Sequence, residues 1–183
     1  MINKDNLNQE LISGLNSSDE TTVSETIREL RIHGNIDVLP DVFSLLFSKR
    51  MENIEDEIVN FLNDIKDQEA VDPFMDAIKE YRGKKSYERL VAACWQCGLD
   101  FSAYIDRFIE LVLEEDYYTS LEAFSVIEEN VTNLNSQQRS ARIEFIRAKF
   151  ESLSPEKRLL VNELMSLMSN VSGPFRLDTE NMN

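Results

Sequence analysis

Five hydrophobic positions recur at a constant spacing of 33 residues through three consecutive segments of the chain. The columns read Val38, Val71 and Tyr104; Val42, Met75 and Phe108; Leu45, Ile78 and Leu111; Ile58, Val91 and Phe124; and Phe61, Cys94 and Ile127. All fifteen residues are hydrophobic, whereas hydrophobic residues make up 42% of the whole chain. This register indicates an internal repeat, which constrains the fold more than any other feature of the sequence.

The spacing inside each repeat indicates two helices. Successive columns are separated by four, three, thirteen and three residues. Gaps of three and four place side chains on one helical face, and the gap of thirteen leaves room for a turn. Each repeat is therefore expected to be an antiparallel helix pair. The four pairs are predicted at residues 6–15 and 22–32, 38–49 and 52–66, 71–82 and 87–97, and 103–114 and 119–131.

The pairs at the two ends depart from this register. The first pair lies 31 residues before the second, which a loop two residues shorter explains. A fifth pair is predicted at residues 137–153 and 155–170, with a register of 35 residues or more. Terminal repeats often differ from the others because they present a polar outer face. The longer register of the last pair is therefore consistent with a degenerate capping repeat, and equally with the absence of a fifth repeat.

We expect a single domain over residues 1–171, because 183 residues can bury a core without disulfides or metal. Its repeats are predicted at about 5–34, 35–67, 68–100 and 101–134, with a capping pair at 136–171. Gly34 and Gly98 are predicted to end second helices. Residues 172–183, which begin with Ser172-Gly173-Pro174, are expected to form a flexible tail.

The chain is strongly acidic, with 34 acidic and 19 basic residues and a net charge of −15. Residues 1–135 hold 12 basic and 28 acidic side chains, whereas residues 136–162 hold six basic and three acidic ones. An acidic body repels phosphate backbones and anionic lipid. We therefore expect neither nucleic acid nor a membrane as a partner.

The sequence also predicts a cytoplasmic location. The first residues lack the zones of a secretory signal, and no apolar run approaches the roughly 20 residues that span a bilayer. The two cysteines fit a reducing compartment, where disulfides give no stabilisation.

The helix pairs resemble HEAT-like repeats, which combine a proline early in the first helix with a glycine after the second. The matching segments are Val38-Leu39-Pro40 with Leu45-Leu46, Ala70-Val71-Asp72-Pro73 with Ala77-Ile78, and Val91-Ala92-Ala93-Cys94 with Cys97-Gly98. The Asp-x-x-x-x-Val-Arg stretch of a HEAT inner helix is missing, and Asp106 replaces the proline in the fourth unit. Armadillo repeats therefore stay an alternative, whereas ankyrin and tetratricopeptide repeats fit less well because their own motifs are absent.

The resemblance implies an all-α fold, namely a right-handed α-solenoid of four to five antiparallel helix pairs. In such a stack the second helices line a concave surface that binds partners. The residues offset from the core columns on these helices are predicted to contact a partner: Arg28, Asp56, Asn60, Arg89, Gln96, Glu122, Ser125 and Glu129. That surface is mostly acidic, so the expected partner is a protein with a basic or polar segment.

No motif predicts a catalytic, cofactor-binding or metal-binding residue. Cys94 and Cys97 form a Cys-x-x-Cys pair, but at the C-terminal end of a predicted helix, where the helix dipole opposes thiolate formation. Cys94 also falls in a core column, so a buried structural role is predicted. His33, the only histidine, is expected to cap a helix or lie at the surface.

The remaining conspicuous residues also fit structural roles. The acidic runs at residues 55–57 and 114–116 lack the spacing and central glycine of a calcium loop, and are interpreted as solvated faces. Trp95 aligns with the core stripe and is expected to pack between repeats. One of Tyr117 and Tyr118 is expected to be exposed.

The leading functional hypothesis is a non-enzymatic protein–protein interaction or scaffold module. The main alternative is an acidic decoy that inhibits a basic, nucleic-acid-binding protein, and its affinity would fall more steeply with salt. An enzyme with an unrecognised site is a third hypothesis. A DNA-repair role, suggested by the basic stretch at residues 139–158, is a fourth.

Overall fold

The computed structural model describes residues 4–33 and 36–170, and this part of the chain forms ten α-helices and no β-strand. The all-helical class predicted from the sequence is confirmed. The predicted turn at Gly34 and the predicted tail at residues 172–183 lie outside the described residues.

The helices belong to two compact units, Met1–Phe101 and Ser102–Asn183, called unit 1 and unit 2 below. Unit 1 holds α1 (Lys4–Leu15), α2 (Glu20–His33), α3 (Leu39–Leu46), α4 (Glu55–Asn63), α5 (Val71–Glu80) and α6 (Tyr87–Gln96). Unit 2 holds α7 (Ile105–Glu114), α8 (Tyr117–Asn130), α9 (Ser136–Lys149) and α10 (Pro155–Asn170). The division falls within one residue of the predicted boundary between the third and fourth repeats. The single domain expected over residues 1–171 stays a prediction.

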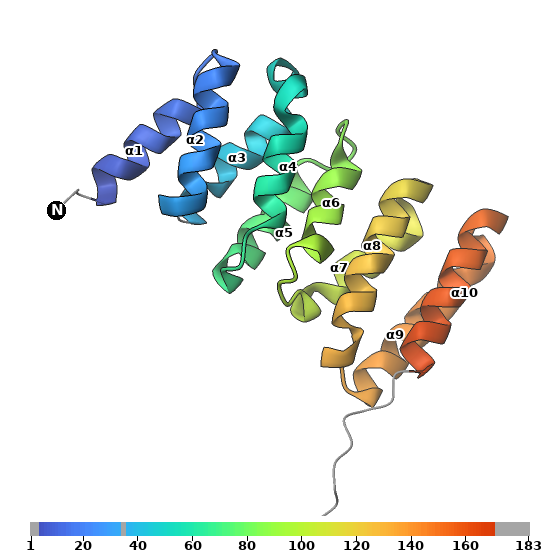
Figure 1. Ribbon diagram of the computed structural model, residues 1–183. Coiled ribbons are helices and arrows are strands. Elements are labelled where there is room, and N and C mark those ends of the chain that lie inside the picture. The colour runs from blue at the N-terminus through green and yellow to red at the C-terminus, as the bar shows by residue number, and fades with distance from the viewer. Residues whose placement is uncertain (1–3, 34–35, 171–183) are drawn as a thin grey trace, which may run out of the picture. The chain divides into compact units, whose positions relative to one another are not determined.

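Unit 1 is built from three helix pairs that stack in two layers. The second helices α2, α4 and α6 lie side by side in one layer, and α1, α3 and α5 form the layer behind them (Figure 1). Each helix packs against its pair partner and against its counterpart in the next pair. The helix pairs predicted from the 33-residue register are therefore present in this unit.

Unit 2 contains two further pairs, in which α8 and α10 lie side by side (Figure 1). Lys157, in the first turn of α10, donates a hydrogen bond to the backbone carbonyl of Val112 near the end of α7 (3.1 Å). Burial lowers the pKa of Lys157, although the nearby carboxylates of Glu115 and Asp116 act in the opposite direction. This contact attaches the beginning of α10 to the preceding pair, and the predicted fifth pair is present.

Local sequence explains where several helices begin and end. Asp116 caps α8 by accepting hydrogen bonds from the backbone amides of Tyr118 (3.0 Å) and Thr119 (3.2 Å). Gly98 follows α6 with a φ of +71°, as predicted for a glycine that ends a helix. The helices predicted to extend to residue 49 and to start at residue 52 are shorter, because Ser48 is extended and a 3-10 turn over Lys49–Ile54 follows it.

The apolar columns form most of the core. Twelve of their fifteen residues are buried, whereas Met75, Tyr104 and Phe124 are only half-buried. In α5 the neighbouring Phe74 occupies the core instead of Met75, with its ring edge-on to the rings of Phe43 and Phe101. Tyr104 lies in the 3-10 turn before α7, and Phe124 borders a cavity described below.

Candidate functional site

The eight predicted partner-binding residues divide between the two units. Five lie on the second helices of unit 1: Arg28 on α2, Asp56 and Asn60 on α4, and Arg89 and Gln96 on α6. Three lie on α8 of unit 2: Glu122, Ser125 and Glu129.

Arg89 joins α6 to α4 in unit 1. Its guanidinium forms ion pairs with the carboxylates of Glu55 (2.8 Å) and Asp56 (2.5 Å). On the neighbouring helix, Arg28 forms a longer ion pair with Glu57 (3.4 Å). The three charged residues that were predicted in unit 1 are therefore engaged in ion pairs within the unit.

These contacts belong to a larger set of polar links between α2, α4, α6 and the turns before them, which we call the polar ladder. Its pairs are each 33 residues apart: Glu20 with Asn53, Ser24 with Glu57, Arg31 with Asp64, Glu52 with Lys85, Asp56 with Arg89, and Asn63 with Gln96. Arg28 with Glu57 and Arg89 with Glu55 add ion pairs beside it. The ladder stabilises the alignment of neighbouring pairs.

Sequence reasoning missed the ladder because it followed apolar columns only. Polar residues of complementary type also recur at the 33-residue spacing, as Asp56 and Arg89 do, and this signal could have been found. The polar links from α2 to α4 join residues that are 33 apart, whereas the apolar residues of the first pair align with those of the second at an offset of 31. Asn60, also predicted to bind a partner, lies exposed on α4.

The predicted residues of unit 2 lie apart from the cavities. Glu129 is exposed, whereas Glu122 and Ser125 are half-buried, and the Ser125 hydroxyl donates to the carbonyl of Leu121 (3.3 Å). On a helical projection these three residues sit roughly 100° around α8 from Phe124 and Glu128, which line the cavity below.

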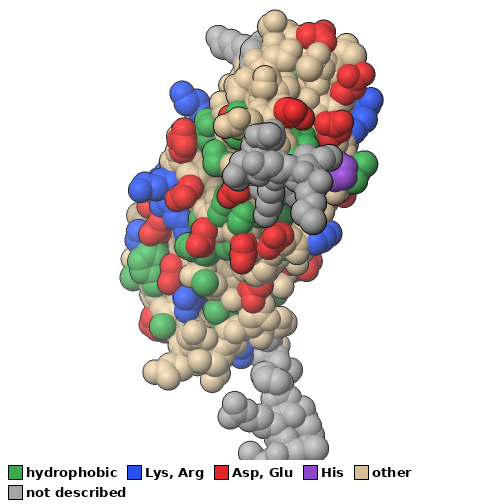
Figure 2. All heavy atoms as spheres, turned by 90° about the vertical axis from the view of Figure 1, so that its left-hand side faces the viewer, with side chains coloured by type: hydrophobic (Ala, Val, Ile, Leu, Met, Phe, Trp, Pro, Cys, Tyr) green, Lys and Arg blue, Asp and Glu red, His purple; other side chains and the backbone are tan. Residues whose placement is uncertain are grey.

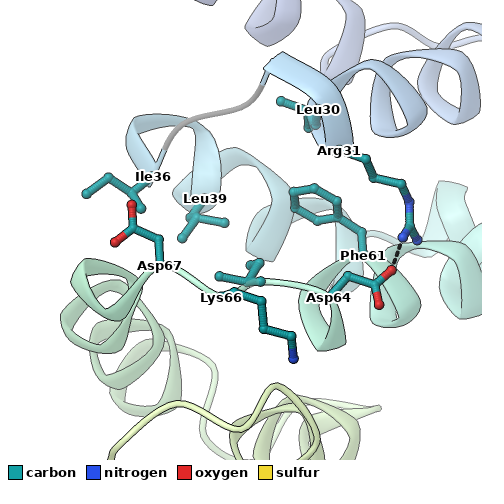
Figure 3. A pocket seen from close by; sticks show the side chains of 9 residues that line it. Leu30, Arg31, Ile36, Leu39, Phe61, Asp64, Lys66 and Asp67 are labelled. Carbon is teal, nitrogen blue, oxygen red and sulfur yellow. Dashed lines mark hydrogen bonds and ion pairs between the residues drawn. The ribbon is translucent and has the colours of Figure 1, made fainter.

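Unit 1 has a cavity of about 250 Å³ near the C-terminal ends of α2 and α4. The buried side chains of Leu30, Leu39 and Phe61 line it, and the ion pair between Arg31 and Asp64 lies at one side (Figure 3). The polar groups at its edge are engaged with protein atoms: Arg31 with Asp64, Lys66 with the Asn63 and Cys97 carbonyls, and Asp67 with the Glu69 amide. We interpret this cavity as a packing gap between the ends of the helices and the turns beside Ile36 and Ile65.

Unit 2 has a second cavity, of about 350 Å³, between α8 and α10. It is lined by Phe124 and Glu128 from α8 and by Glu163, Ser166, Leu167 and Asn170 from α10. Helical periodicity extends both walls toward the beginnings of the two helices, because Tyr117 and Leu121 share the face of Phe124, and Leu159 shares the face of Glu163. These nine residues are called the α8–α10 groove.

Apolar side chains are unusually exposed along this groove. Tyr117, Leu121 and Leu159 are 51%, 39% and 72% exposed. They are three of the six large hydrophobic side chains found exposed among residues 7–33, 36–48 and 52–170, whose side chains the structure describes. Tyr118 is exposed as well, so both tyrosines are exposed where the sequence predicted one. Both stand in the first turn of α8, beyond the buried face that begins at Thr119.

The equivalent face of α4 in unit 1 is covered by a neighbouring helix. Glu55, Ile58 and Leu62 of α4 occupy the same repeat positions, two repeats earlier, as Leu121, Phe124 and Glu128 of α8. Ile58 and Leu62 are completely buried in a unit where α6 packs along α4. In unit 2 the ion pair between Asp106 and Arg142 spans 36 residues instead of 33, in line with the predicted drift, and the face of α8 stays partly open beside α10.

The predicted basic stretch is largely neutralised within unit 2. Arg139 is buried and donates to the backbone carbonyl of Leu134 (2.5 Å). Three more arginines pair with carboxylates: Arg142 with Asp106 (2.9 Å), Arg147 with Glu144 (2.7 Å) and Arg158 with Glu151 (3.5 Å). This arrangement gives little support to a DNA-binding role for residues 139–158.

The cysteines and the histidine have the structural surroundings predicted for them. Cys94 and Cys97 are buried free thiols at the C-terminal end of α6. Burial raises the pKa of both thiols, and the neighbouring Cys97 raises that of Cys94 further. His33 is exposed at the end of α2, on a side of the molecule where acidic, basic and apolar side chains are interspersed (Figure 2). Trp95, expected to pack between repeats, is half-buried.

In the described part of the chain, no three His, Cys, Asp or Glu side chains come together as a metal-binding group would require. None of the helices within residues 4–33 and 36–170 combines the length and apolarity needed to cross a bilayer. Comparison with known proteins finds no family model that matches the chain and no curated protein related to it.

Proposed function

We propose that this protein is a non-enzymatic protein-interaction module, and that unit 2 binds an apolar segment of a partner protein in the α8–α10 groove. One observation carries the proposal: exposed Tyr117, Leu121 and Leu159 continue the walls of a cavity between two helices. Exposed apolar surface beside a concave feature is typical of protein-binding sites. An amphipathic segment with its apolar face in the groove would remove this surface from water.

The proposal includes the HEAT-like architecture implied by the resemblance, a right-handed α-solenoid of helix pairs. The two-layer stacking of α1 to α6 in unit 1 supports it, as does the constant 33-residue offset of the apolar columns. We also propose a cytoplasmic location, which the two free thiols support.

We favour the α8–α10 groove as the partner-binding site over the surface predicted from the sequence. In unit 1, Arg28, Asp56 and Arg89 are engaged in ion pairs between helices, so a partner would have to compete with intramolecular contacts. The predicted surface of unit 1 is retained as a secondary proposal, in which Asn60, exposed on α4, contacts the partner.

The net charge of −15 keeps the acidic decoy as a second candidate function. A decoy would bind its basic target through many exposed carboxylates, and its affinity would fall steeply with salt. A partner held by apolar contacts in the groove would lose little affinity between low and physiological ionic strength. A salt titration of any partner therefore separates the two functions.

The test compares partner capture by three forms of the full chain. The parent, the groove variant Leu121→Glu/Leu159→Glu and the control Ile32→Glu would be used as baits in a lysate of the native host. Ile32 is 75% exposed and belongs to unit 1, so the control adds the same kind of charge to the unit that does not contain the groove. We expect partners that the parent and the control retain and the groove variant loses. Equal retention by all three folded baits would contradict the proposal.

A further inference from the structure

The α8–α10 groove differs chemically between its two ends. From this difference we infer that it binds an amphipathic helix in one orientation, with the apolar anchor of the helix near Leu121 and Leu159 and a lysine or arginine beside Glu128 and Glu163. This inference rests on the proposed function and adds the class of partner and its direction in the site.

The apolar end lies toward the beginnings of α8 and α10. Tyr117 and Leu121 are on the first two turns of α8, and Leu159 is on the second turn of α10. Three carboxylates lie near this end, those of Glu114, Glu115 and Asp116. All three interact with the charge of Lys157 at the beginning of α10, and Asp116 also accepts hydrogen bonds from the amides of its own helix. This end therefore offers mainly aromatic and aliphatic surface.

The acidic end lies toward the C-termini of the same helices. Of the six residues that line the cavity, Glu128 and Glu163 carry carboxylates and none carries a positive charge. Glu128 is in the last turn of α8, and Asn170, which also lines the cavity, is the last residue of α10. The terminal carbonyl groups of a helix carry partial negative charge, which adds to that of the two carboxylates. A cation is the complementary group at this end.

The dimensions of the groove set the spacing of the ligand. Glu128 follows Leu121 by seven residues, and a helix rises 1.5 Å per residue, so the two ends are roughly 10 Å apart. The wall from Tyr117 to Glu128 is roughly 16 Å long, which matches about three turns of a bound helix. A helical partner would therefore carry its apolar anchor and its basic residue about seven positions apart on one face.

The experiment uses two labelled synthetic helical peptides of about four turns, with identical apolar faces. One carries lysines about seven positions from its leucine anchor, and the other carries glutamates there. Fluorescence anisotropy measures the binding of each peptide to the full chain. We expect the basic peptide to bind about tenfold more tightly than the acidic one, because two carboxylates attract one peptide and repel the other.

Two double variants identify the source of the discrimination. Glu128→Gln/Glu163→Gln should remove most of the difference in affinity between the two peptides. Glu25→Gln/Glu29→Gln removes the same charge from exposed positions on α2 of unit 1, and it should leave that difference intact. Equal affinity for the two peptides, both lost in Leu121→Glu/Leu159→Glu, would overturn the inference and leave the proposed function standing. Binding of neither peptide would contradict both.

A third full-length variant tests whether the chain fills its own groove. The sequence after Asn170 contains Phe175, Arg176 and Leu177, which combine apolar and basic character. If the basic peptide bound only to Phe175→Ala/Arg176→Glu, the occupant would be this segment, and the inference of a separate partner would be overturned. Equal binding to the parent and to this variant supports a partner in trans.

Discussion

Gly14 of α1 lies so close to Thr26 of α2 that a β-carbon at position 14 would overlap the hydroxyl oxygen of the threonine. The hydroxyl is held by a hydrogen bond to the backbone carbonyl of Thr22 (2.8 Å), so it cannot swing away without losing that bond. The first helix pair thus depends on a residue without a side chain at its closest point.

Gly14→Ala is therefore expected to destabilise the protein by about 1–3 kcal/mol, the usual result of overpacking. In a helix with free space, the same change would stabilise by roughly 0.5–1 kcal/mol. Urea denaturation measures the difference. Adding Thr26→Ala to Gly14→Ala removes the atoms that clash, so the pair should be less destabilised than the sum of the single changes. An additive result would show that the two residues do not touch.

Arg89→Gln should destabilise by about 1 kcal/mol, because Arg89 bridges two carboxylates of α4 and its side chain is largely shielded from solvent. The matched control is Arg28→Gln, whose ion pair is longer and whose side chain is 67% exposed. The control should change stability by less than about 0.5 kcal/mol. The effect at Arg89 should shrink at high salt, and a larger effect at Arg28 than at Arg89 would contradict this reading of the ladder.

Phe61→Ala and Phe124→Ala should have unequal effects, although both residues occupy apolar columns. Phe61 is buried, so its loss should cost about 3–5 kcal/mol. Phe124 is half-buried beside the α8–α10 groove, and we expect a cost of about 1–2 kcal/mol. Chemical denaturation of both variants tests this ranking. Equal large losses would mean that the groove is closed in solution.

Asp116→Ala should destabilise by about 1 kcal/mol at neutral pH, because α8 loses its N-cap. Partial burial raises the pKa of Asp116, but the hydrogen bonds from Thr119 and Tyr118 outweigh it and place the pKa below its ordinary value of 3.8. The cap is therefore fully stabilising above that ordinary value, and its contribution is lost as the pH falls through the lower folded-state pKa. The difference between parent and variant should vanish in this acidic range. Asp116→Asn, which keeps a cap without a charge, should show no such dependence on pH.

Cys94 and Cys97 should resist thiol reagents in the folded protein at pH 8, because both are buried and burial raises the pKa of each thiol. Both should react at once in denaturant, which serves as the control. Cys94→Ser should also lower stability, since it places a hydroxyl in a core column. Rapid labelling of either thiol without unfolding would show that α6 opens locally.

The helix pairs could be predicted because the apolar residues that define them, such as Ile58 and Val91, recur at a constant spacing in the sequence. The groove could not be predicted, because Phe124 follows the same spacing and yet is only half-buried. Its exposure depends on how tightly α10 packs on α8, and the register of the last pair drifts. The ion pair between Asp56 and Arg89 was missed for a different reason. Its two opposite charges do recur at the 33-residue spacing, but the apolar columns alone do not include them.

The polar ladder also distinguishes one repeat from the next. At its edge toward α6, α4 and the turn before it present Glu52 and Asp56 to Lys85 and Arg89, and toward α2 Asp64 meets Arg31. The carboxylates that α4 and its preceding turn contribute to the ladder thus meet arginine or lysine side chains on both sides. Two copies of α4 placed side by side would bring carboxylates together, and two copies of α6 would oppose cations, so each such exchange is disfavoured. The ion pairs contribute modestly to stability, but they favour the observed order of the repeats over arrangements in which like charges would meet.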